Sequence, residues 1–298
     1  MSNNPHKAYA TTWRDTVVRR FGARAMLRRT MRDMTLRVKS WLDTKDESTF
    51  LRCLACHHVF DDQRTEFLRL IQMLKHRGQF IDTETCLAMA EGNNKIDGRY
   101  FHLSFDDGYR NVIRNALPIL CDEQVSMIMF APTHWIGSDW DNAAHFSLEI
   151  AEYRDVLEMA TWDDLRQMIT NGFDVGSHTK THVRLASLSN EPESLDDELR
   201  GSKAEIETQL GRPCTTIAYP YGKPGDYDST TFQQTKVAGY RAGFGIHRGT
   251  VVGGRTPMML IPRHHFEAEW PVPHVRYFAN GNMEEYWRKH VGEQGQPG

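Results

Sequence analysis

Two adjacent aspartates, Asp106 and Asp107, follow an apolar run and precede a glycine in the stretch LSFDDGYRN. Neighbouring carboxylates repel each other, and they are costly to bury unless they are paired or bind a cation. A solvated Asp-Gly turn is the simpler interpretation of this dipeptide. The apolar residues before the pair favour a polar site at the end of a buried strand.

Two histidines with a ligand-like spacing, His178 and His182, occur in the stretch GSHTKTH. On a helical turn this spacing would place both imidazoles on one side, where they could share a metal ion. The chain has 14 histidines, so the spacing alone is weak evidence. With a carboxylate from another strand end, it predicts a site of two histidines and one aspartate, with positions left open for water and substrate.

The cysteines suggest no disulfide framework. Their number, five, is odd, which favours reduced thiols in a cytosolic compartment. Cys53 and Cys56 form a CxxC pair followed by His57, but a zinc ribbon requires a second pair at a suitable spacing and none exists. We therefore expect a strand that contains cysteines.

Composition is that of a globular protein, with 298 residues, 40% hydrophobic and 25% charged. The net charge of −3 gives no nucleic-acid signature. We see no apolar segment typical of a secretory signal and no apolar run of membrane-spanning length. These features predict a cytoplasmic protein, with peripheral contact to the inner face of the membrane as a further option.

The first 45 residues are basic, with eleven Lys or Arg against three Asp, a balance of +8. Residues 8–42 show helical periodicity with apolar and basic faces, so we expect an N-terminal helical extension over residues 1–48. Such a segment can contact an anionic membrane surface or a partner chain. The alternative is a helix packed on its own domain.

From residue 49 to 275, strand and helix patterns alternate about six times, which predicts a parallel sheet covered by helices. Residues 276–298 are expected to form a C-terminal tail. In a (β/α) barrel the carboxyl ends of the strands meet at one mouth, which would gather the polar residues that follow them. The expected strands are 50–60, 99–105, 126–132, 173–178, 214–222, 241–246 and 258–266.

The motifs FDDG, SHTKTH and YPYG, in this order, resemble those of the polysaccharide deacetylase family, also called carbohydrate esterase family 4 or NodB-type deacetylases. The resemblance covers residues 50–270. It implies an α/β fold, a distorted (β/α) barrel with seven or eight strands. It also implies hydrolysis of N- or O-acyl groups, mostly acetyl groups on amino sugars, with a divalent metal that is often zinc.

Carried over residue by residue, the resemblance makes Asp106 the general base. Asp107, His178 and His182 would bind the metal, most often zinc in this family. The backbone N–H of Tyr221 would help to hold the oxyanion.

Two positions depart from the family pattern. Many members have an arginine that orients the base where this chain has Ala218; Arg263 either supplies that cation instead or is a surface arginine. The general acid is usually a late histidine, and strand alternation favours His265 over His264 because His265 shares a face with Arg263. His57 either lines the mouth or is a core histidine.

The resemblance and the predicted site together imply a metal-dependent hydrolase that removes an N-acetyl group from an amino-sugar-containing precursor in cell-surface glycan biosynthesis. One alternative is a deformylase or amidase acting on a lipid-linked sugar or a small amide. Another is a non-catalytic member that binds glycan. Residues 134–158 are rich in aromatic and acidic side chains, and they form either a lid over the site or an insertion on the barrel rim.

Overall fold

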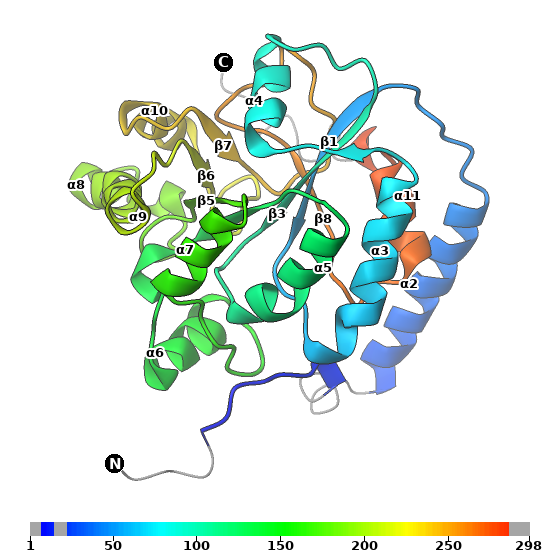
Figure 1. Ribbon diagram of the computed structural model, residues 1–298, viewed down its shortest axis with the longest axis horizontal. Coiled ribbons are helices and arrows are strands. Elements are labelled where there is room, and N and C mark those ends of the chain that lie inside the picture. Colours follow the sequence, from blue (N-terminus) through cyan, green and yellow to red (C-terminus); the bar gives the residue numbers. More distant parts are fainter. Residues whose placement is uncertain (1–6, 15–22, 286–298) are drawn as a thin grey trace.

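Short apolar strands and helices alternate along the chain in the computed structural model, which describes residues 7–14 and 23–285. Among these residues, eight strands form one parallel sheet in the order β7-β6-β5-β4-β3-β1-β8, with β2 paired to the start of β3 (Figure 1). The strands are β1 (Phe50–Cys56), β2 (Gln79–Phe80), β3 (Arg99–Phe105), β4 (Ile128–Ala131), β5 (Asp174–Ser177), β6 (Thr216–Ala218), β7 (Ala242–Phe244) and β8 (Arg263–His265).

The first and last strands of this order meet and nearly close the sheet into a barrel. Phe244 forms a parallel bridge with Ile261, two residues before β8. The N–H of Gly245 donates to the Ile261 carbonyl at 3.0 Å, and the N–H of Ile261 donates to the Gly243 carbonyl at 2.8 Å. The expected distorted (β/α) barrel is confirmed.

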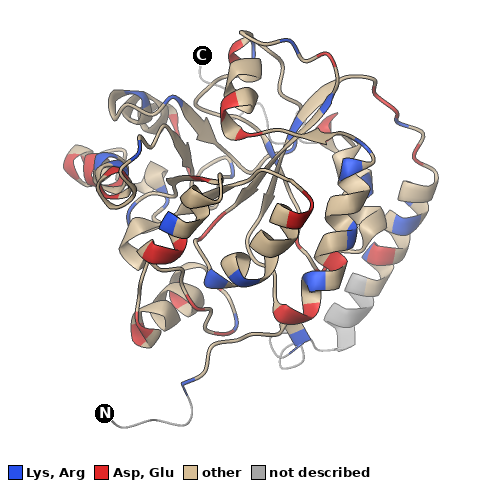
Figure 2. Cartoon of the chain, viewed as in Figure 1, with Lys and Arg blue, Asp and Glu red and all other residues tan. Residues whose placement is uncertain are grey.

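Helices surround the barrel, and Lys and Arg alternate with Asp and Glu over their outer faces (Figure 2). Sequence periodicity did not predict α4, which lies between β2 and β3. The helices are α2 (Ala23–Trp41), α3 (Arg64–Lys75), α4 (Thr83–Glu91), α5 (Leu117–Asp122), α6 (Trp140–His145), α7 (Trp162–Thr170), α8 (Pro192–Asp196), α9 (Ser202–Leu210), α10 (Ser229–Val237) and α11 (Val272–Ala279). None of the described helices is long and apolar enough to cross a bilayer.

The N-terminal helical extension is confirmed by α2. The expectation of a helix from residue 8 is wrong for residues 8–12, which have no helical structure, and residues 15–22 of the expected segment lie outside the described residues. Helix α2 packs beside α11, where the Arg276 guanidinium donates to the Ser40 carbonyl at 2.7 Å. Because α11 spans the boundary expected at residue 275, part of the expected tail belongs to this helical layer.

Candidate active site

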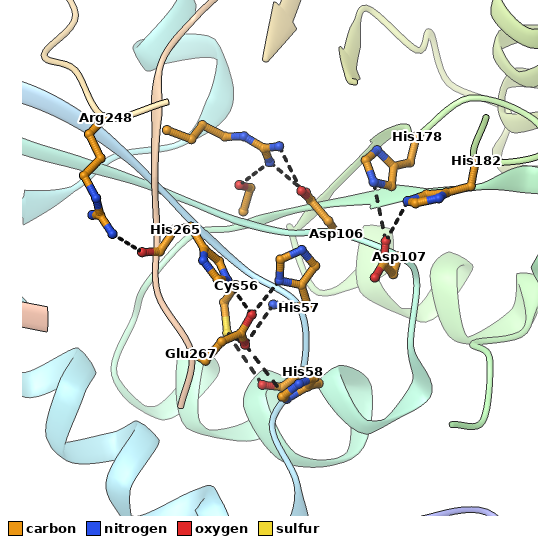
Figure 3. A network of polar contacts seen from close by, with 12 residues as sticks. Cys56, His57, His58, Asp106, Asp107, His178, His182, Arg248, His265 and Glu267 are labelled. Atoms are coloured by element: carbon orange, nitrogen blue, oxygen red, sulfur yellow. Dashed lines mark hydrogen bonds and ion pairs between the residues drawn. The ribbon is translucent and has the colours of Figure 1, made fainter. Parts of the chain in front are cut away.

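The predicted site residues lie together at the mouth formed by the carboxyl ends of the strands. Asp106 and Asp107 follow β3, His178 follows β5, and Arg263 begins β8. His57 follows β1 and completes the group (Figure 3). In a parallel barrel this edge gathers side chains from several strands, so residues far apart in sequence become neighbours.

Asp107, His178 and His182 converge on one point and form a candidate metal centre. Their ligand atoms lie within 4.8 Å of one another. The Nε2 atoms of His178 and His182 are 3.5 Å and 3.2 Å from Asp107 Oδ1. The Nδ1 of His178 lies 2.8 Å from the carbonyl of Ala218, which leaves Nε2 free to face a cation.

The electrostatics of these three residues fit a bound cation. Burial would raise the pKa of Asp107, but His178 and His182 hold it well below its usual range. Burial lowers the pKa of His182 despite the nearby carboxylate. A carboxylate oxygen beside two imidazole nitrogens is a donor set that zinc and similar ions prefer.

The loop that carries the histidines is not helical, so the helical turn expected from their spacing is wrong. Thr179 and His182 instead have φ angles of 65° and 69°, in the left-handed region. The N–H of His182 donates to Thr179 Oγ1 at 3.1 Å, which holds the turn. Asp107 and Tyr221 also have positive φ angles, of 69° and 60°. Backbone strain of this kind clusters at functional sites.

Gly108 allows the chain to turn sharply after the two aspartates. Its φ is +70°, and a Cβ at this position would lie 2.8 Å from the Cδ1 of Ile136. A larger residue would therefore meet both a strained backbone and a clash.

Asp106 and Arg263 form a fully buried ion pair with two parallel bonds. The guanidinium nitrogens lie 2.7 Å and 2.8 Å from the two carboxylate oxygens. Arg263 also donates to Ser104 Oγ and to the Gly245 carbonyl, each at 3.0 Å. Burial would raise the pKa of Asp106, but Arg263 holds it below its usual value. Arg263 therefore lies in the site and is not a surface arginine.

Glu267 anchors two histidines beside the aspartates, and sequence reasoning missed it. His57 Nδ1 and His265 Nε2 both lie 2.6 Å from Glu267 Oε1. The signal was available, because Glu267 lies two residues after His265 and strand alternation continues past β8. His264 lies elsewhere, with its Nε2 3.1 Å from Glu284 Oε1.

The two histidines on Glu267 differ in charge. Burial would lower the pKa of His57, but Glu267, Asp107 and Asp106 raise it to about 10. Burial lowers the pKa of His265 despite the same carboxylate. His57 is therefore protonated at neutral pH and His265 is neutral.

Residues 134–158 pack against the candidate metal ligand His182 and against Tyr221. The Phe146 ring lies 5.5 Å from the His182 ring, and the Tyr221 hydroxyl donates to the Ile150 carbonyl at 2.9 Å. Tyr153, in the same segment, packs edge-on against Tyr109. The candidate metal ligands are at most 4% exposed, so the described chain leaves little direct access to them.

Cys53 and Cys56 lie in β1, as expected for a strand and not for a zinc ribbon. They face opposite sides. Cys56 Sγ is 3.4 Å from Glu267 Oε2, whereas Cys53 faces the barrel interior.

Comparison with known proteins identifies related sequences and folds. The sequence profile described as polysaccharide deacetylase matches residues 93–243. YxkH of Bacillus subtilis (strain 168), assigned by name to the polysaccharide deacetylases, is 25% identical over 181 residues, covering 60% of this chain. The match spans 57% of the length of that relative.

Solved structures share the fold at low sequence identity. IcaB from Ammonifex degensii has a TM-score of 0.66 at 21% identity, covering 78% of this chain and 98% of its own. The Streptococcus pyogenes deacetylase PplD, solved with acetate, has a TM-score of 0.60 at 18% identity, covering 77% and 97%. The BpsB deacetylase domain from Bordetella bronchiseptica has a TM-score of 0.59 at 20% identity, covering 76% and 98%.

Proposed function

The chain belongs to the polysaccharide deacetylase family, and from this we propose that it is a metal-dependent hydrolase that removes an N-acetyl group from an amino-sugar-containing substrate. A precursor in cell-surface glycan assembly is the proposed setting. The observation that carries the proposal is the pairing of two unlike carboxylates at one mouth. Asp107 faces two imidazoles, while Asp106 faces a guanidinium.

Asp107, His178 and His182 would hold one divalent ion, with zinc the best fit to two nitrogens and one oxygen. When bound, that ion would polarise the acyl carbonyl and lower the pKa of a water molecule. Asp106 would accept the proton of the attacking water at a carboxylate oxygen. Arg263 keeps Asp106 ionised and fixes its plane, the task that the family's motif arginine performs and Ala218 cannot.

The remaining steps concern the oxyanion and the leaving amine. The backbone N–H of Tyr221 would donate to the oxygen that becomes negative when water adds to the carbonyl. As the C–N bond breaks, the amine nitrogen takes a proton. The sequence favoured His265 as its source, but the charges favour His57, which holds a proton at neutral pH. Glu267 contacts Nδ1 of His57, which leaves Nε2 of His57 free to face the amine.

A second candidate is an amidase or deformylase acting on a lipid-linked sugar or a small amide. The observation that favours it is the covered site, since Asp106, Asp107, His178 and His182 are each at most 4% exposed. A small acyl substrate needs less displacement of residues 134–158 than a polymer does. The third candidate, a non-catalytic glycan-binding member, depended on Ala218 and loses that support because Arg263 pairs with Asp106.

The central test is metal analysis combined with acetate and formate release over nucleotide- and lipid-linked N-acylated amino sugars. Asp106→Asn should retain the metal and lose about 10²–10⁴ in turnover, the usual contribution of a positioned acid–base group. Asp107→Asn should weaken metal binding first, and excess metal should partly restore turnover. Near wild-type turnover of Asp106→Asn would refute the mechanism, and full metal content in His178→Ala would refute the ligand set.

Peripheral membrane contact through residues 8–42 is proposed in a narrower form, limited to the outer face of α2. Trp13 is not available for membrane contact, because its ring packs against His58 and Phe60. The outer face of α2 and the residue after it carry large apolar side chains that are 53–81% exposed: Met31, Met34, Val38, Trp41 and Leu42.

Cations flank this apolar face on both sides, as an interfacial helix requires. At 100° per residue, Arg32 and Lys39 lie along one edge and Arg37 along the other. Asp33 and Ser40 face the protein, where they contact α11. The full chain should therefore co-sediment with anionic vesicles. The double variant Trp41→Ser, Met34→Ser should no longer co-sediment. Binding that survives the double substitution would refute the assignment.

A further inference from the structure

A second set of donor atoms lies inside the barrel, away from the mouth. Cys53 of β1 and His102 of β3 are aligned in register, and Cys86 of α4 faces them. All three side chains are fully buried. Helix α4 covers the amino end of the strands, where Arg241 next to β7 pairs with its Glu84. These residues therefore join α4 to two central strands.

The donor distances fit a single ion. The Sγ atoms of Cys53 and Cys86 are 3.7 Å apart, and all three ligand atoms lie within 4.8 Å of one another. Two thiolates bound to one tetrahedral ion at about 2.3 Å would be about 3.8 Å apart. A disulfide would bring the sulfurs to about 2.05 Å.

The histidine supplies an independent indication of a ligand. His102 Nε2 lies 3.3 Å from Thr83 Oγ1, but its buried Nδ1 has no hydrogen-bond partner in the part of the chain that the structure describes. A buried polar atom without a partner carries a cost in folding free energy. Coordination to an ion near the thiols would remove that cost.

We propose that Cys53, Cys86 and His102 form a structural zinc site that fastens α4 to the barrel. Two thiolates and a neutral imidazole neutralise a divalent ion, so no net charge is buried. Thiolate sulfur together with imidazole nitrogen is a common donor set of structural zinc sites. Full burial leaves no route for substrate, so the site supports the fold and not the reaction. The proposal does not depend on the proposed function.

Cobalt substitution tests the proposal, because only a sulfur-ligated Co²⁺ ion gives an intense thiolate-to-metal charge-transfer band in the near ultraviolet. The full chain is produced in cobalt medium under reducing conditions. The folded wild type should show this band, and Cys86→Ser should lose it together with about one metal equivalent per chain. The matched control Cys121→Ser, at an exposed cysteine, should keep both.

A separate variant distinguishes this site from the catalytic one. His178→Ala should keep the thiolate band even where it loses metal at the mouth, so a failure of the proposed function leaves this result unchanged. Absence of the band in folded, cobalt-loaded wild type would overturn the proposal, whether or not Cys86→Ser folds. A band that persists in folded Cys86→Ser would overturn it as well, as would an intact mass showing a Cys53–Cys86 disulfide.

Discussion

Replacing Arg263 by methionine removes one partner of a fully buried ion pair and should destabilise the fold by about 3–5 kcal/mol near pH 7. The structure places this change at the upper end of such effects. The side chains of Arg263 and Asp106 are 0% and 3% exposed, and two bonds of 2.7 Å and 2.8 Å join them. Ser104 Oγ cannot replace the lost charge.

The loss should depend on pH with a definite sign. In the wild type the pKa of Asp106 is lowered, so the pair stabilises the fold above the unfolded pKa of about 3.9 and loses this effect as pH falls through the folded value. Without Arg263, burial dominates and the pKa of Asp106 should rise. The variant can then protonate Asp106, and the stability difference from wild type should shrink toward acid pH.

Urea unfolding at pH 7 and pH 5 measures this difference in wild type, Arg263→Met, Asp106→Asn and the double variant. The double variant should be more stable at pH 7 than the sum of the two single losses predicts. Arg52→Met is the matched control, because Arg52 is also fully buried and ion-paired but contacts Glu284 outside the site. It should lower stability and leave turnover of the folded enzyme unchanged.

Turnover supplies the second measurement. Arg263→Met should reduce turnover in the folded fraction, and adding Ala218→Arg should restore part of it by returning a guanidinium to the base. A loss below about 0.5 kcal/mol at pH 7, the range of ordinary surface substitutions, would refute the reasoning. A loss that does not change with pH would refute the assignment of the effect to Asp106.

Two further predictions concern the proton donor and the turn. His57→Gln should reduce turnover more than His265→Gln. Wild-type turnover should fall as pH rises through about 10, where His57 loses its proton. Equal effects of both variants in a pH–rate series would contradict the assignment of His57 as the proton donor. The raised pKa also means that the stabilisation from His57 is complete below about 6.5 and is lost through about 10. Gly108→Ala should lower the melting temperature more than Gly137→Ala, because both have positive φ but only Gly108 would bring a Cβ within 2.8 Å of Ile136; equal shifts in calorimetry would contradict a steric cause.

The barrel and the metal-ligand candidates could be predicted because their signals are local. Most strands lie in short runs rich in apolar residues, and Asp107 and His178 come just after β3 and β5. The histidine spacing pointed to two residues that the structure does bring together, but a left-handed turn and not a helix does so.

Partners that meet only when the barrel closes could not be predicted with the same certainty. Asp106 and Arg263 are 157 residues apart, and His57 and Glu267 are 210 residues apart. The sequence shows that arginines and glutamates exist, but which of them faces the mouth depends on the pairing of β1 with β8 and on the register of that pair. The same applies to Cys53, whose partner comes from α4 and not from its own CxxC motif.

The exchange of the motif arginine for Ala218 follows from the space inside the barrel. Ala218 is in register with Phe244, and both belong to the interior cluster that includes Phe130. The Arg263 guanidinium lies 5.3 Å from the Phe130 ring centre and 5.9 Å from that of Phe244. A second arginine at position 218 would enter this space, bring a like charge beside Arg263 and overpack the interior. The alanine in β6 therefore leaves room for the Arg263 side chain of β8. The cation beside Asp106 comes from β8 and not from β6.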